Sequence, residues 1–328
     1  MREVQQGAGL RRVVRRGEIY TVAIAGVTIV AFFVMAILTD FQGVFAALKK
    51  VGGGAVVAVL AAALGNYFFR ILRFRFLLAR RGFRVPPRYS AQIYVAGFAM
   101  TATPGKLGEF IRMWLLKARY KFPYRRTFPI MFTDRADDVI ANVILCLCGL
   151  RAFSNYTTAT VIVGCVFLFG CALLMRPRLL KSVIGYAFKL SGGIKPRLFG
   201  LMRQLVSGTS DLFQPYPFVI GAGLGCLGWF LECMALYLCM AIYMPQATIE
   251  QAIFIFTFAS LVGGLSFLPG GIGGTELTMA GLLSAVGLTI EEATAVTAVI
   301  RIGTLWFGIS LGYGAMLGLL FRQPKVPQ

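Results

Sequence analysis

Apolar residues occur along this chain in long runs that are separated by short clusters of positive charge. Several runs reach the roughly 20 residues that a helix needs to cross about 30 Å of hydrocarbon. They predict about six membrane-spanning helices, at 19–38, 51–72, 127–150, 156–175, 217–243 and 293–321. Two more apolar stretches, 90–116 and 252–285, are interrupted by Pro-Gly turns. The pattern predicts an all-α polytopic membrane protein that forms a single membrane domain over residues 1–328.

Positive charge sets the expected orientation of these helices. Most of the 33 lysines and arginines lie before residue 19, between 70 and 88, between 117 and 126, between 176 and 203, or after 321. Cytoplasmic segments carry an excess of Lys and Arg, so we expect both termini in the cytoplasm and the protein in the cell inner membrane. In this interpretation Arg70 and Arg73 belong to a cytoplasmic basic cluster. The mixed basic and apolar segment 176–214 predicts helices that lie in the cytoplasmic interface.

The two interrupted stretches predict helical hairpins that re-enter the membrane. Both flanks of 90–116 are basic, whereas neither flank of 252–285 is, so the two hairpins should enter from opposite sides. Segments 51–150 and 217–321 then have the same order of elements with opposite directions, which is an inverted repeat. The spacing agrees, because Arg135 follows Pro104 by 31 residues and Arg301 follows Pro269 by 32.

Interrupted helices at matched positions of inverted halves indicate a transporter binding site near the bilayer midplane. Half-helix N-termini at such breaks suit a phosphate or another anionic head group. The residues we expect to bind substrate are Thr103, Pro104, Gly105, Lys106, Glu109, Asp134, Arg135, Asp138, Glu232, Pro269, Gly270, Gly271, Gly273, Glu276 and Arg301. The alternative is that these charges form structural ion pairs that hold the hairpins in place. Arg112, near the end of its hairpin, is expected to snorkel to the interface.

The amino-acid composition limits which partners and chemical groups we expect. Hydrophobic residues make up 58% of the chain and charged residues 14%, against about 25% charged in soluble domains. The net charge of +20 follows from the positive-inside pattern, so nucleic acid is not an expected partner. Histidine is absent and the seven cysteines lie within or beside apolar runs. We therefore expect no metal, no cofactor, no disulfide and no catalytic residue.

Three motifs carry a resemblance to a known family. They are Thr101-Ala-Thr-Pro-Gly-Lys-Leu-Gly-Glu-Phe-Ile-Arg112, Thr133-Asp-Arg-Ala-Asp-Asp138, and Leu268-Pro-Gly-Gly-Ile-Gly-Gly-Thr-Glu276 followed by Arg301. The chain resembles the lysylphosphatidylglycerol synthase transmembrane-region family, also described as flippase-like. That resemblance implies two related halves with re-entrant helices and a role in moving lipids. Synthases of this family carry a large soluble aminoacyl-transferase domain after the membrane part, so we do not expect synthase activity from a chain that ends at Gln328.

The sequence therefore favours a flippase that moves a polar-headed phospholipid or a lipid-linked precursor between leaflets. Membrane lipids are the expected partners, and lipid-biosynthesis enzymes or a second copy in a homodimer are further candidates. The Thr-Asp-Arg order at 133–135, where relatives often have Glu-Arg, leaves the substrate open. One alternative is an integral membrane lipid or glycosyl transferase that uses Asp134, Asp137 and Asp138. Another is a non-catalytic partner of such an enzyme.

Overall fold

The computed structural model describes residues 41–101, 108–152, 158, 161, 165, 177–190, 212, 214–266 and 268–321. Every regular element among these residues is a helix, and none is a strand. Three helical stretches are long and apolar enough to cross a membrane, at Gln42–Arg80, Pro215–Ala241 and Ile290–Leu319. An all-helical, multi-pass membrane protein is thereby supported. The predicted span 19–38 lies outside the described residues, as does 156–175 apart from three isolated positions.

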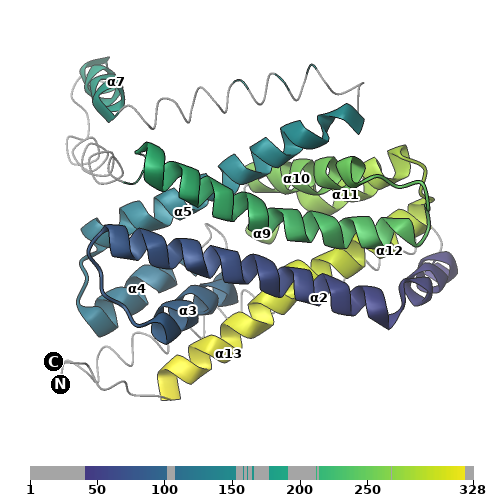
Figure 1. The fold of residues 1–328 in the computed structure, drawn as a ribbon, viewed down its shortest axis with the longest axis horizontal. Helices are drawn as coiled ribbons and strands as arrows, with labels where there is room; N and C mark the ends of the chain where they lie inside the picture. The colour runs from purple at the N-terminus through teal and green to yellow at the C-terminus, as the bar shows by residue number, and fades with distance from the viewer. Residues whose placement is uncertain are drawn as a thin grey trace.

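The elements follow one another in two series (Figure 1). The first series is α2 (Phe41–Arg80), α3 (Pro87–Ala96), the 3₁₀ turn η1 (Gly97–Met100), α4 (Gly108–Tyr120), α5 (Tyr124–Gly149), η2 (Leu150–Ala152) and α7 (Pro177–Leu190). The second is α9 (Pro215–Ala241), α10 (Ile249–Leu265), η4 (Pro269–Gly271), α11 (Gly274–Ala285), α12 (Ile290–Arg301), the π-helical turn η5 (Ile302–Trp306) and α13 (Phe307–Phe321). Capping boxes begin α10 at Thr248 and α12 at Thr289, which defines both starts.

Helix α2 is longer than the predicted 51–72 and corrects the assignment of two arginines. It runs over 40 residues, with a kink at Gly52, whose φ of 69° and ψ of 164° are not helical. Arg70 and Arg73 lie in its interior and are buried, with relative exposures of 8% and 0%. The cytoplasmic basic cluster to which they were assigned therefore has two members that lie buried inside the bundle. The physical reason is pairing with aspartates of α5, which a count of charges along the chain does not reveal.

Both interrupted stretches contain helices on either side of a break. The first consists of α3, η1 and α4, and its residues 102–107 lie outside the described part. The second consists of α10, η4 and α11, with Gly270, Gly271 and Gly273 at φ values of 64°, 68° and 87°. Residues that carry a side chain rarely adopt this left-handed backbone conformation, which explains the run of glycines at the second break. The side of the membrane from which each stretch enters remains a prediction.

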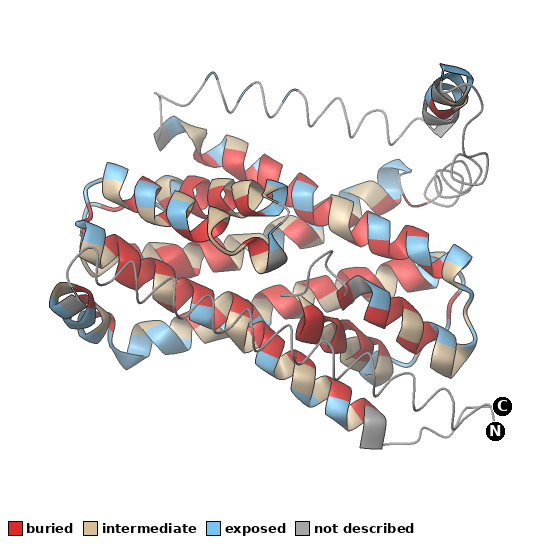
Figure 2. Cartoon of the chain, turned by 180° about the vertical axis from the view of Figure 1, so that it is seen from behind, coloured by how far each residue is buried: buried red, intermediate tan, exposed pale blue. Residues whose placement is uncertain are grey.

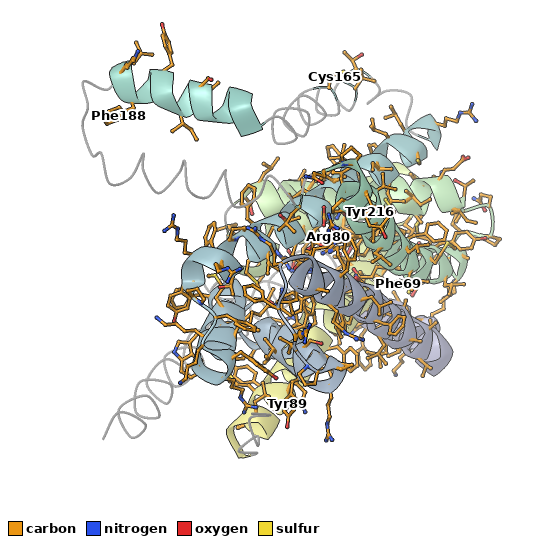
Figure 3. All side chains as sticks on the ribbon, turned by 60° about the vertical axis from the view of Figure 1, so that its left-hand side comes forward. Phe69, Arg80, Tyr89, Cys165, Phe188 and Tyr216 are labelled. Carbon is orange, nitrogen blue, oxygen red and sulfur yellow. The ribbon has the colours of Figure 1, made fainter. Side chains whose placement is uncertain are left out.

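Helix packing between the two series is reciprocal. Helices α2 and α9 pack on each other along their lengths, and Arg80 of α2 lies over the Tyr216 ring of α9 at 5.9 Å (Figure 3). In addition α2 packs on α12, just as α9 packs on α5. Helix α13 of the second series also packs on α3 and η1 of the first, and α5 of the first series packs on α10 of the second. Each series therefore places a helix that follows its own break, α5 or α13, against the broken segment of the other.

Burial follows the inward faces of the helices (Figure 2). One apolar core lies among α9, α10, α11 and α12, and a second lies among α2, α3, α4 and α13. Large apolar side chains are also exposed on the outside of the bundle, among them Val57, Phe68, Val219 and Ile302. Such exposure suits helices that face lipid.

Helix α7 stands apart from the helical bundle in Figures 1 and 3. It is 14 residues long, and its Lys189 lies in the last turn beside Phe188, which Figure 3 labels. It falls in the segment 176–214, for which we predicted interfacial helices. The remainder of that segment lies outside the described residues apart from two positions, so its depth in the membrane stays a prediction.

Candidate functional site

Four arginines and three aspartates form a buried group between α2, α4 and α5. We call it the arginine–aspartate cluster, and its members are Arg70, Arg73, Arg112, Asp134, Arg135, Asp137 and Asp138. Arg70 and Arg73 are three residues apart on α2, and Asp134 and Asp138 are four apart on α5. Each pair therefore lies on one face of its helix, and the two faces meet in the cluster. With every member ionised, the cluster holds one more positive charge than negative.

Arg73 lies at the centre of the cluster and is fully buried. Its Nε and Nη2 donate to Asp134 Oδ1 at 2.9 and 2.8 Å, and Nη2 also lies 2.6 Å from Asp138 Oδ1. One guanidinium thus joins two carboxylates that are one turn apart on α5. Charged groups persist in such a dry environment only when they are paired in this way.

Arg70 and Arg135 complete the pairing of Asp138. Arg70 Nη2 donates to Asp138 Oδ2 at 2.6 Å, and Arg135 Nη1 lies 3.3 Å from the same oxygen. Trp229 of α9 donates its indole N–H to Asp138 Oδ1 at 3.3 Å, and its ring lies 5.4 Å from the Arg70 guanidinium carbon. Arg135 keeps 32% of its side chain exposed, whereas Asp138 keeps 7%.

The structure corrects the expectation that Arg112 snorkels. Only 2% of Arg112 is exposed, and its Nη1 donates to Asp134 Oδ2 at 3.2 Å. Its Nε donates to the Tyr94 carbonyl at 3.1 Å, and its guanidinium lies 3.7 Å from the Tyr94 ring centre. The carboxylate of Asp134 and the aromatic face together hold this arginine inside the protein.

Asp137 is the member of the cluster without a hydrogen-bond partner among the described residues. It is 1% exposed, and neither carboxylate oxygen is hydrogen-bonded. Helix α9 presses against it, since a Cβ built on Gly221 would lie 2.3 Å from Asp137 Oδ2. The glycine therefore allows the two helices to approach at this carboxylate.

In the second series, an ion pair between Glu276 and Arg301 stabilises the turn between α10 and α11. Arg301 Nε donates to Glu276 Oε1 at 2.6 Å, and Arg301 Nη2 donates to the Gly270 carbonyl at 2.8 Å. The other Glu276 oxygen accepts from the Gly273 N–H at 2.7 Å, which caps α11. This network ties α12 to both sides of the glycine turn, as the structural alternative expected.

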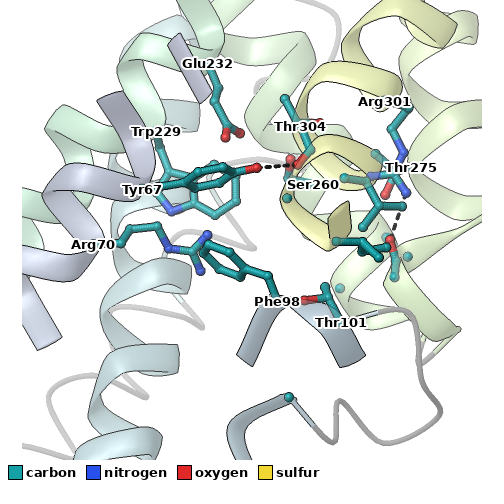
Figure 4. A pocket seen from close by; sticks show the side chains of 18 of the residues that line it. Tyr67, Arg70, Phe98, Thr101, Trp229, Glu232, Ser260, Thr275, Arg301 and Thr304 are labelled. Carbon is teal, nitrogen blue, oxygen red and sulfur yellow. Dashed lines mark hydrogen bonds between the residues drawn. The ribbon is translucent and has the colours of Figure 1, made fainter. Parts of the chain in front are cut away.

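A cavity of about 210 Å³ lies between the two broken segments (Figure 4). Its wall includes Gly97 and Gly108 from the first break and Gly270 and Gly271 from the second. The charged residues that line it are Arg70, Arg112, Arg135, Arg301 and Glu232. Figure 4 shows Arg70, Tyr67 and Trp229 on one side, and Thr275, Thr304 and Arg301 on the other. We call this space the central cavity.

The acidic partners of these arginines do not line the central cavity. Asp134, Asp138 and Glu276 contact the arginines on the side away from the cavity. Glu232 instead points toward the cavity and accepts a 2.5 Å hydrogen bond from Asn66. Hydroxyl groups of Ser260, Thr275 and Thr304 belong to residues of the wall as well. The cavity therefore presents cationic donors, small hydroxyls and glycine backbone to whatever enters it.

Five of the residues predicted to bind substrate line the central cavity, namely Arg135, Glu232, Gly270, Gly271 and Arg301. Asp134, Asp138, Gly273 and Glu276 are absent from the wall and support it through the contacts above. Thr103, Pro104, Gly105 and Lys106 lie outside the described residues, as do the side chains of Glu109 and Pro269. Whether any of these residues binds substrate remains a prediction.

Sequence reasoning missed the residues that α2 contributes. Asn66, Arg70 and Arg73 recur at spacings of four and three, which places them on one helical face. A signal was present, because three membrane aspartates on α5 had one neighbouring arginine, Arg135, and needed more cations. Arg70 and Arg73, at the end of the predicted span 51–72, were candidates for these cations.

The described residues offer no grouping suited to a metal ion. No three of their Cys, Asp or Glu side chains come together as potential ligands. Asp134 and Asp138 are each bound by several arginines, which occupies the oxygens that a metal-dependent transferase would need. The transferase alternative therefore gains no support from this cluster.

Comparison with known proteins gives a match over most of the chain. The family described as Lysylphosphatidylglycerol synthase TM region matches residues 21–312. A UPF0104 membrane protein of Methanothermobacter thermautotrophicus is 39% identical over 89 residues, which is 27% of this chain and 27% of that protein. A UPF0104 membrane protein of Pyrococcus horikoshii is 24% identical over 255 residues, which is 67% of this chain and 73% of its relative.

Proposed function

This chain belongs to the Lysylphosphatidylglycerol synthase TM region family, and we propose that it is a flippase that moves a phosphate-bearing lipid between the leaflets of the cell inner membrane. The observation that carries the proposal is the lining of the central cavity. Four arginines face one glutamate there, and three of the acids that neutralise the arginines lie behind them.

Electrostatics favours an anionic head group in this space. Guanidinium groups at the wall of the central cavity attract a phosphate, and this attraction exceeds that in bulk water because protein replaces part of the solvent. Arginine also presents paired N–H donors that match phosphate oxygens. The carboxylates behind the arginines hold them in place before a ligand arrives, which lowers the ordering cost of binding.

The size and backbone of the central cavity suit a head group and exclude a whole lipid. Its volume of about 210 Å³ is below the roughly 300–1,000 Å³ of sites that enclose a drug-sized molecule. The acyl chains of a bound lipid would therefore remain in the surrounding bilayer. Gly97 and Gly108 allow the segments on either side of the first break to pack closely on each other and on Arg112 at the cavity wall.

The reciprocal packing of the two series supports a transport cycle. In transporters built from inverted repeats, one half rocks against the other around a site at their interface. Here residues beside both breaks contribute to one cavity, and α5 and α13 pack on the broken segment of the opposite series. We propose that the halves expose the cavity alternately to the two leaflets.

Arg135→Gln is the sharpest test, because Arg135 lines the central cavity and is the most exposed of the cluster arginines, with the longest contacts to the aspartates. Asp134 keeps Arg73 and Arg112, and Asp138 keeps Arg70 and Arg73. We expect the variant to fold and to lose most translocation of head-group-labelled anionic phospholipid in proteoliposomes.

Arg88→Gln is the matched control, because this exposed arginine lies outside the central cavity and its variant has the same charge change. Its translocation rate should equal that of the unmodified protein. Unchanged translocation in Arg135→Gln, or no translocation of any lipid by the folded unmodified protein, would contradict the proposed function.

A further inference from the structure

A second and larger cavity lies at the basic end of the bundle. Its volume is about 1480 Å³, and it is lined by the last turns of α2, the connection 81–86, the start of α3 and the end of α4. It shares no lining residue with the central cavity. Its basic lining residues are Arg75, Arg84, Arg119 and Lys121, and no acidic residue is among the described residues that line it. We call it the peripheral cavity.

Three of these basic side chains are available to a ligand. Arg75, Arg84 and Lys121 form no hydrogen bond or ion pair through their side chains with any other residue that the structure describes. Arg119 differs, since its guanidinium donates to the carbonyl of Leu319 and so connects α4 to α13. The arginines of the central cavity are all paired with carboxylates, so the peripheral cavity has the greater uncompensated positive charge.

The backbone at Lys121 adds an independent observation. Its φ of 59° lies in the left-handed region, and it is the one non-glycine residue with positive φ in the described part of the chain. Its N–H donates to the Lys117 carbonyl at 3.0 Å and closes α4, a position where glycine is the usual residue. A lysine here bears a conformational cost, which points to a role for its side chain.

The remaining wall of the peripheral cavity is apolar and aromatic. It includes Leu72, Phe76, Phe83 and Phe122, and the rings of Phe83 and Phe122 stack with centres 4.1 Å apart. Burial raises the pKa of Tyr120, whose hydroxyl therefore stays protonated and able to donate. A ligand that fits this wall has both an anionic part and a hydrocarbon part.

The position along α2 identifies the source of such a ligand. The candidate membrane span of α2 ends at Arg80, and the cavity begins at Leu72. The cavity therefore lies near the end of a span, where lipid head groups meet hydrocarbon and where basic residues attract anionic lipids. We propose that the peripheral cavity binds an anionic phospholipid, with its phosphate at Arg75, Arg84 and Lys121 and an acyl chain along the aromatic wall.

This second site goes beyond the proposed function and does not depend on it. The test compares two variants of the full chain that each lose two positive charges at the same end of the protein. Arg84→Gln/Lys121→Gln removes charges from the peripheral cavity, and Arg88→Gln/Arg125→Gln removes exposed charges outside it. Each protein is titrated with phosphatidylglycerol or phosphatidylcholine in detergent, and bound lipid is counted by native mass spectrometry.

We expect the cavity variant to bind phosphatidylglycerol about 30-fold more weakly, because each basic residue near a membrane surface contributes a factor of about five. The control variant should retain at least most of the affinity of the unmodified protein, and phosphatidylcholine should bind more weakly throughout. Equal losses in the two variants would overturn the proposal. Binding of inorganic phosphate as tight as that of phosphatidylglycerol would also overturn it, because the ligand would then be a soluble anion.

Lys121→Gly separates a ligand-binding role from a structural one. Glycine relieves the left-handed backbone, so the thermal unfolding temperature should rise while affinity for phosphatidylglycerol falls. Unchanged affinity in the stabilised variant would show that the lysine is not a ligand. Because the readout is equilibrium binding by variants whose central cavity is unchanged, its failure and a failure of lipid translocation are distinguishable.

Discussion

The side-chain amide of Asn66 on α2 donates a 2.5 Å hydrogen bond to the carboxylate of Glu232 on α9. Asn66 precedes Pro104 by 38 residues, and Glu232 precedes Pro269 by 37, so the two occupy equivalent places in the proposed repeats. The helices cross closely at this point, because a Cβ on Gly228 would lie 3.0 Å from Asn66 Oδ1. The contact thus joins an uncharged residue of one series to an acidic residue of the other beside the central cavity.

Glu232→Gln should tighten binding of a phosphate-bearing head group in the central cavity. The variant removes the one acidic side chain among the described residues of the cavity wall, and glutamine can still accept from Asn66. Loss of a repulsive charge from the cavity wall predicts an affinity about tenfold higher. Native mass spectrometry with anionic lipid measures this, and weaker binding in a folded variant would contradict the prediction.

Arg73→Met should destabilise the protein far more than Arg135→Gln. Removing Arg73 takes away one arginine that joins Asp134 to Asp138 in a fully buried position, which predicts a loss of about 3–5 kcal/mol. Arg135 is partly exposed and its contacts are longer, so a loss of about 1 kcal/mol or less is expected. Thermal unfolding in one detergent compares the two variants. Equal losses would show that Arg73 is not the central partner.

Glu276 and Arg301 should behave as one unit. Single substitutions Glu276→Gln and Arg301→Gln each leave a buried charge without its partner, while the double variant removes both charges. The interaction free energy from a double-mutant cycle should be about 1–3 kcal/mol, measured as free energies of unfolding. Additive effects would mean that the 2.6 Å contact contributes little to holding the second break.

Gly312→Ala should weaken the contact between α13 and the first break, and Gly314→Ala should not. A Cβ on Gly312 would lie 2.2 Å from the backbone nitrogen of Ala99, which cannot move without shifting η1. We expect a loss of about 1–3 kcal/mol from this overpacking. Gly314 has no atom within 4 Å of its Cβ position, so alanine there should leave stability unchanged or raise it slightly. Matched unfolding temperatures for the two variants would contradict this packing.

The fold could be predicted from the sequence where apolar runs are long. The runs at 127–150, 217–243 and 293–321 correspond within a few residues to α5, α9 and the pair α12 and α13. Prediction failed at the end of α2 because its arginines have good helix propensity and polar side chains, which suit a solvated helix end or a paired interior equally well. Only their rotation toward Asp134 and Asp138 distinguishes these cases, and that depends on how α2 packs on α5.

The candidate site was predictable where it depends on motifs and their spacing, and not where it depends on contacts between distant segments. The Pro-Gly breaks and the spacing to Arg135 and Arg301 indicated one shared site, and residues beside both breaks line the central cavity. Arg112 was misassigned because its depth was judged from distance along the chain, whereas Asp134 and the Tyr94 ring determine its environment. Contacts between distant segments carry this information, and a linear pattern does not contain it.

Helix α2 contributes to the walls of both cavities. Arg70 lines the central cavity, and Leu72, two residues further along the helix, lines the peripheral one, a separation of about 3 Å along the helix axis. A displacement of this stretch of α2 would therefore alter the two cavities together.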